Sequence, residues 1–326
     1  MNDVTTAPAS ADKYFATRRI GHVNIFITEY DRSLAFYREV VGLCDGWTRP
    51  KIGGGFLNNG YTHHDIGFIP WSHSIAGKGV DGPGLNHLAF EVETEVDLVA
   101  GYEHACVAGK EFLRTVDHLV AYSVYSKDPH GFAIEIYADT PLSFNDPDFL
   151  ELRRASNDWV PGKLPPSDKR NYPQYPKPRK ADNSLFHARH LSGAALVSDA
   201  YDAAIDYYEE VVGLEEIDGG RDRAHITLGG HAGCRDLSIF RAEPGSGLQP
   251  GFHHMSFSVF DEDDLAASID SASKAGITID RKIDHPVRRG AVVSDPDRFQ
   301  ILFHVDREEG PRDLGSVAPD EAIWLV

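Results

Sequence analysis

Residues 117–135 read DHLVAYSVYSKDPHGFAIE, and residues 284–302 read DHPVRRGAVVSDPDRFQIL, an offset of 167 residues (284 − 117 = 167). Both stretches begin with Asp-His and carry Asp-Pro near their end. Glu135 of the first stretch is replaced by Leu302 in the second. A buried carboxylate is costly without a partner or a ligand, so a duplicated scaffold that keeps it in one copy indicates where the chemistry lies. We therefore expect the functional site in the first half of the chain.

A second pair of stretches extends the duplication toward the N-terminus. Residues 22–43 (HVNIFITEYDRSLAFYREVVGL) resemble residues 193–214 (GAALVSDAYDAAIDYYEEVVGL), at an offset of 171 (193 − 22 = 171). Each stretch predicts a strand, because apolar and β-branched residues come first, and then a helix with one apolar face. Asp31 and Asp202 are the expected N-caps of these helices, and Gly42 and Gly213 are expected to end them.

The same strand-and-helix pattern recurs within each half, at residues 86–109 and 253–276. Short alternating runs follow every such unit and predict three further strands. The sequence therefore predicts an α+β fold of four strand-helix-strand-strand-strand (βαβββ) modules, paired into two domains. The expected boundaries are a flexible N-terminal tail at 1–17, a first domain at 18–140, a Pro-rich linker at 141–186, a degenerate repeat domain at 187–308 and a C-terminal tail at 309–326.

Composition excludes several classes of partner. The 326 residues carry 50 acidic and 32 basic side chains, a net charge of −18, which argues against binding to nucleic acid or to an anionic membrane surface. Three widely spaced cysteines form no CxxC pair and predict neither a disulfide framework nor a zinc finger. The sequence offers no export signal and no run of apolar residues long enough to span a bilayer. A cytoplasmic protein is the expectation.

Three potential metal ligands occupy matching strands of the first half: His22, His87 and Glu135. Two neutral imidazoles and one carboxylate on neighbouring strands make a facial triad, which holds divalent iron and leaves the opposite face open to substrate. At the same places the second half has Gly193, His254 and Leu302. The domain at 18–140 is therefore the expected metal-binding, catalytic domain, and the repeat domain at 187–308 is expected to be metal-free.

The chain from about residue 19 to residue 306 resembles the vicinal oxygen chelate superfamily and, within it, the type I extradiol catechol dioxygenases. The spacing of the three ligands carries the resemblance, together with SVYSKDPHGFAIEIYAD (123–139), THHDIGFIP (62–70) and VDHLVAYSVY (116–125). The resemblance implies a vicinal oxygen chelate fold with curved mixed sheets. It also implies extradiol (meta) cleavage of a catechol-type diol in aromatic catabolism, with both atoms of O2 incorporated, and Fe(II) as the cofactor with Mn(II) as the alternative.

The same resemblance assigns roles to further residues. It makes His64 the acid-base catalyst and places Tyr125 and His118 where they would hydrogen-bond a substrate oxygen. His63 is the rival of His64: because adjacent strand residues face opposite ways, only one of the two is expected in the pocket, and His63 is expected at the surface. Members of this superfamily are commonly assemblies, so a homo-oligomer is expected.

Two other functions stay open at this point. A metal-dependent isomerase or lyase of the glyoxalase type would use a fourth protein ligand, for which His64 is the candidate. A non-catalytic protein that binds an aromatic ligand is the third reading. Trp47, Trp71 and His73 lie near the expected pocket strands, as ring-binding residues or as ordinary core aromatics. The sequence leaves open the substituents of the catechol and the position of cleavage.

Overall fold

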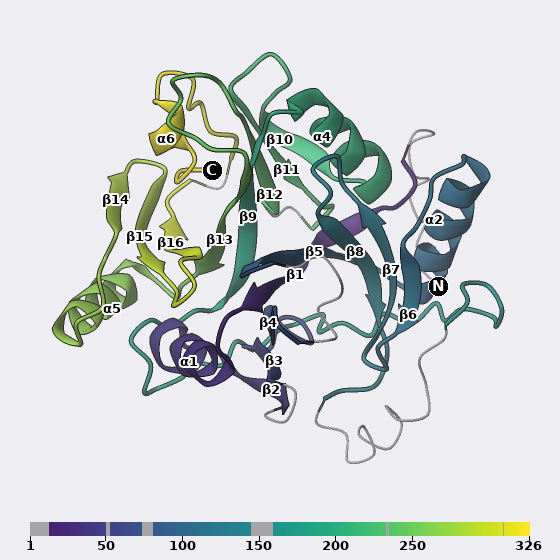
Figure 1. Cartoon of the computed structure of the whole chain (residues 1–326), viewed down its shortest axis with the longest axis horizontal. Coiled ribbons are helices and arrows are strands. Elements are labelled where there is room, and N and C mark those ends of the chain that lie inside the picture. Colours follow the sequence, from purple (N-terminus) through teal and green to yellow (C-terminus); the bar gives the residue numbers. More distant parts are fainter. Residues whose placement is uncertain (1–12, 50–52, 74–80, 145–158, 233–234, 309) are drawn as a thin grey trace.

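The computed structural model describes residues 13–49, 53–73, 81–144, 159–232, 235–308 and 310–326. They form two eight-stranded sheets with equivalent strand orders, β2-β3-β4-β1-β5-β8-β7-β6 and β10-β11-β12-β9-β13-β16-β15-β14 (Figure 1). Each sheet contains two βαβββ modules. The expected α+β class and the two repeated halves are confirmed.

The first sheet and its helices follow the chain order predicted for the first half. Its strands are β1 (Thr17–Ile27), β2 (Cys44–Arg49), β3 (Gly54–Asn58), β4 (Ile66–Pro70), β5 (Gly84–Val92), β6 (Arg114–Asp117), β7 (Ala121–Lys127) and β8 (Ala133–Asp139). Its helices are α1 (Tyr30–Ala35), which continues into a π-helical turn η1 (Phe36–Val41), and α2 (Glu95–Val107). Within each module, the first and last strands are parallel neighbours, as in β1 with β4 and β5 with β8.

The second sheet repeats this order. Its strands are β9 (His190–Ser198), β10 (Glu215–Gly219), β11 (His225–Gly229), β12 (Leu237–Arg241), β13 (Gly251–Ser258), β14 (Arg281–His285), β15 (Arg288–Ser294) and β16 (Gln300–Asp306). Its helices are α4 (Tyr201–Tyr207) with the π-helical turn η3 (Tyr208–Val212), and α5 (Glu262–Lys274); a short helix, α6 (Pro319–Ala322), follows. We call residues related by the offsets of 171 or 167 counterparts.

The helix ends explain why both repeats have a glycine at the same position. Gly42 and Gly213 end η1 and η3 in the left-handed conformation, with φ of 86° and 83°, as expected. A β-carbon at Gly42 would lie 2.3 Å from the carbonyl oxygen of Phe186, and one at Gly213 would lie 1.8 Å from that of Phe15. The segment that precedes each repeat therefore runs against the helix end of the other repeat.

The expected N-caps are wrong. Glu29, two residues before Asp31, caps α1, and its carboxylate accepts a hydrogen bond from the backbone N–H of Arg32. In the second repeat α4 begins after Ala200, which makes no side-chain cap, and Asp202 lies in the first turn. An acidic residue in a first turn is favourable next to the helix dipole, so both positions tolerate Asp without using it as a cap.

Buried carboxylates join the two repeats symmetrically. Asp65 accepts a hydrogen bond from the backbone N–H of Leu191 at 2.9 Å, and its counterpart Asp236 accepts one from Ile20 at 2.8 Å. Burial raises the pKa of both carboxyls to about 6. Because each aspartate bridges to the other repeat, the sheets are held in one fixed relation.

A tyrosine–aspartate pair repeats the same exchange. The hydroxyl of Tyr37 donates to Asp295 at 3.0 Å, and that of Tyr208 donates to Asp128 at 3.1 Å. All four side chains are buried, and both tyrosine rings belong to one apolar core that includes residues of both repeats. The two repeats therefore share one hydrophobic core.

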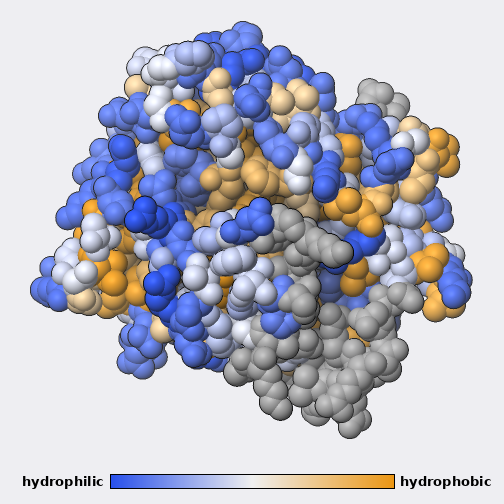
Figure 2. All heavy atoms as spheres, viewed as in Figure 1, coloured by the Kyte–Doolittle hydropathy of each residue, from blue (hydrophilic) through white to orange (hydrophobic). Residues whose placement is uncertain are grey.

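The described residues of the expected linker, 159–186, contain no helix or strand. They are hydrogen-bonded to the first repeat, for example through Ser167 to Val96 and through Arg179 to Asn59. Hydrophilic residues cover most of the face shown in Figure 2, and hydrophobic ones gather near its centre and over the end that carries α2. None of the helices in the described ranges combines the length and the hydropathy needed to cross a bilayer.

Removing one hydroxyl of the tyrosine–aspartate pairs should weaken the junction. We expect Tyr37→Phe and Tyr208→Phe each to lower the free energy of unfolding by about 1–3 kcal/mol, because each leaves a buried carboxylate short of one donor. Urea unfolding followed by circular dichroism measures the change. Tyr175→Phe, at a side chain that is 89% exposed, is the control and should change it by less than about 0.5 kcal/mol. Equal effects in all three variants would contradict the role given to the pairs.

Candidate functional site

Three neighbouring strands bring the predicted ligands to one face of the first sheet. His22 on β1 lies opposite Ala89 on β5, and Ala89 lies opposite Glu135 on β8. His87 is two residues before Ala89 on β5, so its side chain points to the same face. All three are buried, with His22 1%, His87 5% and Glu135 2% exposed.

The three donor atoms converge. His22 Nε2 lies 3.2 Å from Glu135 Oε2, His87 Nε2 lies 2.9 Å from the same oxygen, and the two nitrogens are 3.3 Å apart. Ligand atoms on adjacent corners of an octahedron with bonds of about 2.1 Å lie about 3.0 Å apart. The observed spacing therefore fits one divalent cation with three protein ligands on a single face.

The ionisation states also suit a cation. Burial lowers the pKa of His22 to about 3, although Glu135 opposes the shift. Burial alone would raise the pKa of Glu135, but the adjacent side chains of His22 and His87 hold it well below its ordinary value. A neutral imidazole and an ionised carboxylate are the forms that bind divalent metals.

Two asparagines that the sequence reasoning missed orient His87. Asn86 Oδ1 lies 3.2 Å from His87 Nδ1 and fixes the proton there, so that Nε2 carries the free lone pair. The amide nitrogen of Asn24 lies 2.8 Å from that Nε2. Asn24 is two residues after His22 on the same strand, so the alternation of strand side chains would have placed it on the ligand face.

The paired histidines depart from the expectation. His63 and His64 lie in the bend before β4, outside the strand, and both line the cavity. The prediction that His63 faces the surface is wrong: its Nδ1 is 2.8 Å from Asp139, and although burial lowers its pKa, that carboxylate raises it overall. The alternation rule does not apply, since it holds only for extended strand residues.

His64 is the less constrained of the pair. Its ring centroid lies 3.8 Å from that of His22, and neither of its buried nitrogens has a hydrogen-bond partner among the described residues. Burial and the neighbouring His22 hold its pKa well below the ordinary value. The side chain is therefore a neutral imidazole with both nitrogens available to a ligand.

Tyr125 and His118 meet at the opposite wall. Tyr125 on β7 lies directly across from Glu135, and its hydroxyl is 2.9 Å from His118 Nε2. The guanidinium of Arg114 lies over the Tyr125 ring, 4.5 Å from its centroid. Asp117, the other half of the Asp-His pair, accepts the backbone N–H of Leu119 and so stabilises the turn before β7. The Asp-His pair thus has a structural part in Asp117 and a cavity-facing part in His118.

These groups surround a cavity of about 400 Å³. Its apolar wall is formed by Trp47, Phe56 and Phe144, whose rings are parallel to within 13° and have centroids 5.5–5.9 Å apart. Trp71 and His73 lie just beyond β4 and are not among the residues that line it. The cavity therefore combines a flat aromatic wall with a polar end that contains the three converging donors.

The counterpart region of the second repeat is filled by apolar side chains around Leu302 and Val292. His254, the counterpart of His87, stacks on Trp324 with ring centroids 4.6 Å apart. Leu302 and Val292, the counterparts of Glu135 and Tyr125, pack in one apolar cluster with residues 322–326. Arg235 replaces His64 and pairs with Asp218, whereas Cys234, the counterpart of His63, lies outside the described residues. Only one of the three donor positions keeps a ligand side chain there.

Comparisons with known proteins agree with this geometry. Residues 19–136 and 189–303 match the model of the family described as the glyoxalase/bleomycin resistance protein/dioxygenase superfamily. Biphenyl-2,3-diol 1,2-dioxygenase 2 of Rhodococcus globerulus is 24% identical over 142 residues, which cover 41% of this chain and 67% of that protein.

Two solved structures share the fold. The Mn(II)-bound glyoxalase from Novosphingobium aromaticivorans superposes with a TM-score of 0.64 at 14% identity, covering 91% of this chain and 87% of that one. The 2,3-dioxygenase LapB from Pseudomonas sp. KL28 superposes with a TM-score of 0.62 at 16% identity, covering 89% of this chain and 93% of that one. At these identities the likeness is one of fold.

Removal of one donor should abolish metal binding. We expect the protein to bind about one Mn(II) or Fe(II) per chain and to gain about 2.7 kcal/mol of stability at a metal concentration of 100 times Kd. His87→Ala should lose this gain, because it removes one of the three donors, whereas His254→Ala, at the counterpart position, should keep it. Thermal unfolding with and without Mn(II) under anaerobic conditions measures both. Equal loss in the two variants would contradict the location of the site.

Proposed function

Because the chain belongs to the glyoxalase/bleomycin resistance protein/dioxygenase superfamily, we propose that it is an extradiol dioxygenase that cleaves a catechol-type diol with O2. His22, His87 and Glu135 would hold Fe(II), with Mn(II) as the alternative. The observation that supports this most is the convergence of three donors of the right chemistry at the polar end of a cavity with an aromatic wall. The named activities of the relative and of LapB point the same way.

A divalent iron held by these three residues would supply Lewis acidity to the diol oxygens. The protein's own side chains supply the rest. The parallel rings of Trp47, Phe56 and Phe144 would bind the flat face of the substrate and keep water away from it. Asn86, through its contact with Nδ1, keeps the lone pair of His87 on Nε2, which lies in the donor cluster.

Proton transfer is the role proposed for His64. A diol must lose protons to become a good chelator, and a neutral imidazole with a free nitrogen is suited to accept one. Tyr125 and His118, hydrogen-bonded to each other beside Glu135, would donate a hydrogen bond to a substrate oxygen. In the same proposal residues 18–140 are the catalytic domain, and residues 187–308 support it without a metal.

A second candidate rests on a specific observation. Ligand atoms of His22, His63 and His64 also lie within 4.8 Å of one another. In a glyoxalase-type isomerase or lyase, His64 would be a fourth ligand and not a base. The two functions therefore differ in what loss of His64 does to metal binding.

Oxygen consumption tests the proposal. With Fe(II) loaded anaerobically, we expect the protein to consume O2 and form a yellow ring-opened product from one or more members of a panel of 3- and 4-substituted catechols. His64→Ala should lower kcat by about 100-fold or more, the range for loss of a general base, and leave the bound iron at about one equivalent.

The possible outcomes separate the alternatives. Iron lost together with activity in His64→Ala would favour the four-ligand isomerase or lyase. An iron-loaded protein that consumes no O2 with any catechol of the panel would overturn the dioxygenase proposal.

A further inference from the structure

The second repeat contains a cavity of its own, of about 440 Å³. It lies over the middle of the second sheet and is bounded on one side by β1 of the first. Ser192 on β9 and His304 and Asp306 on β16 line it, as do the guanidinium groups of Arg235 and Arg288. His254 and Val326, which belong to the region around Trp324, also line it, so the cavity has a polar side and an apolar side.

Three of these side chains form a hydrogen-bonded chain. Ser192 Oγ is 2.7 Å from His304 Nε2, and His304 Nδ1 is 3.1 Å from Asp306 Oδ1. Burial alone would raise the pKa of Asp306, but His304 and Arg288 lower it, so this group is an ionised carboxylate that can only accept. The Nδ1 of His304 must then carry the proton.

This fixes the direction of the other bond. Burial lowers the pKa of His304, so its imidazole is neutral and its Nε2 is an acceptor. The hydroxyl of Ser192 is therefore the donor to Nε2. A second acceptor, the carbonyl of Ser256, lies at the longer distance of 3.0 Å. A nucleophile bonded to a base that a third group orients is the arrangement used in nucleophilic catalysis.

The first repeat shows that the scaffold does not require this chain. The counterparts of Ser192, His304 and Asp306 are Gly21, Tyr137 and Asp139. A β-carbon at Gly21 would lie 1.9 Å from the Tyr137 hydroxyl, so a serine does not fit there. The serine and the histidine thus belong to the second repeat alone.

A second series of hydrogen bonds through a serine, a histidine and an aspartate lies elsewhere in the molecule and can be compared with that of Ser192. Ser198 Oγ is 2.7 Å from His130 Nε2, and His130 Nδ1 is 3.2 Å from Asp128. Ser198 is 0% exposed, and its oxygen accepts the backbone N–H of Ala200. No substrate can reach it, so that chain is a structural link between the repeats. Ser192 differs because it faces the cavity.

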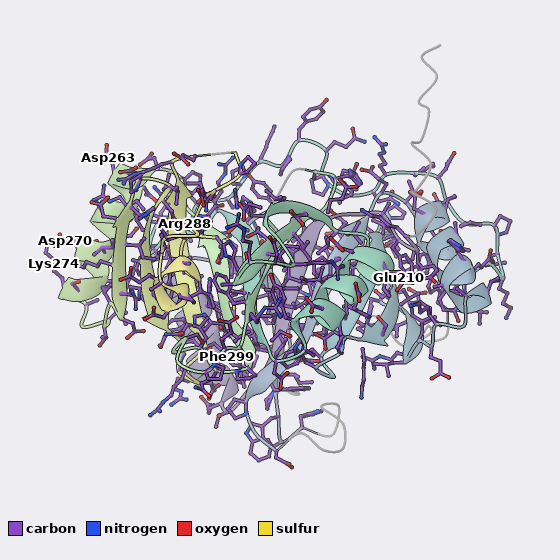
Figure 3. The ribbon with its side chains drawn as sticks, turned by 90° about the horizontal axis from the view of Figure 1, so that it is seen from above. Glu210, Asp263, Asp270, Lys274, Arg288 and Phe299 are labelled. Carbon is purple, nitrogen blue, oxygen red and sulfur yellow. The ribbon has the colours of Figure 1, made fainter. Side chains whose placement is uncertain are left out.

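The guanidinium groups beside the cavity indicate the class of ligand. Arg288, labelled in Figure 3, is buried and shares Asp306 with Arg312, and Arg235 pairs with Asp218. The cavity itself is lined by three arginines and three carboxylates: Arg19, Arg235 and Arg288, and Asp236, Asp306 and Glu308. Burial and the nearby Arg288 lower the pKa of Arg312 to about 10. Each guanidinium has five N–H donors, more than one carboxylate uses. An anionic group is the complementary ligand.

We propose that this cavity is a second catalytic site, which hydrolyses small esters that carry a carboxylate. Ser192 and His304 are the catalytic residues, and Asp306 positions the imidazole. Arg235 and Arg288 attract the carboxylate of the substrate and stabilise the charge that develops on the ester carbonyl oxygen.

The reaction balances without an added reagent other than water. The oxygen of Ser192 bonds to the acyl carbon, its proton passes to His304 Nε2, and the alkoxide leaves with that proton as the carbon–oxygen ester bond breaks. Water then attacks the acyl group, its proton passes to Nε2, and the bond from the acyl carbon to Ser192 breaks. The serine oxygen regains the proton, and the carboxylic acid is released.

A fluorophosphonate probe on the full chain tests the nucleophile. We expect one adduct per chain, located on Ser192 by peptide mass spectrometry and abolished by Ser192→Gly, the residue that the first repeat has at this position. Ser198→Ala, in the inaccessible chain, should label as fully as the wild type. A wild type without an adduct on Ser192, or with its adduct elsewhere, overturns the proposal.

Ester hydrolysis tests the substrate class and the positioning residue. We expect hydrolysis of mono-4-nitrophenyl succinate at least 10-fold faster than that of neutral 4-nitrophenyl butyrate, with Ser192→Gly reduced to the rate of buffer. Asp306→Asn should lower kcat by about 100-fold or more at unchanged KM, because the imidazole takes the wrong tautomer. Equal hydrolysis by wild type and Ser192→Gly overturns the activity, and absence of a preference for the anionic ester overturns the assigned substrate.

Discussion

The register of β1 against β5 positions the three donors of the candidate metal site. It places His22 opposite Ala89, and the parallel pairing of β5 with β8 then places Glu135 beside the same alanine. Alternate residues of these strands, such as Val23 and Leu88, are fully buried in the apolar core on the other face. A shift of one residue would exchange the two faces and expose the core, so apolar burial fixes the register, and the register fixes the donors.

The duplication in the sequence was sufficient to predict the modules and to single out His22 and Glu135, since a position that is polar in one copy and apolar in the other stands out. Glu135 against Leu302 is the clearest case. His87 does not stand out in this way, because its counterpart is His254, and it was predicted from its place in the triad. Capping and local bends were harder to predict. Glu29 rather than Asp31 caps α1, because the helix begins two residues earlier than the pattern suggests, and His63 turns inward because the chain bends before β4. Both depend on backbone dihedrals that apolar periodicity does not encode.

The sequence of the second repeat suggests a copy that has lost its functional side chains. Its structure, however, contains a cavity lined by polar side chains of its own. Around Leu302 the residues near the C-terminus, with Trp324, fill part of the space that is open in the first repeat. In the part that stays open, Arg235 and His304 bring polar groups to positions where the first repeat has His64 and Tyr137. One scaffold therefore carries two different sets of polar side chains. Residues shared by the two halves are those that the fold requires, and polar residues found in one half only belong to the function of that half.

The hydrogen bonds of the segments that precede the two repeats are reciprocal. The backbone N–H of Tyr14 donates to the carbonyl of Glu210. At the counterpart positions, the backbone N–H of Leu185 donates to the carbonyl of Glu39. Each half thus lends its leading segment to the other. Two copies of a single repeat would be able to make the same exchange. Fusion of such a pair removes the need for identical halves, so mutations can accumulate in one half while the other keeps its ligands.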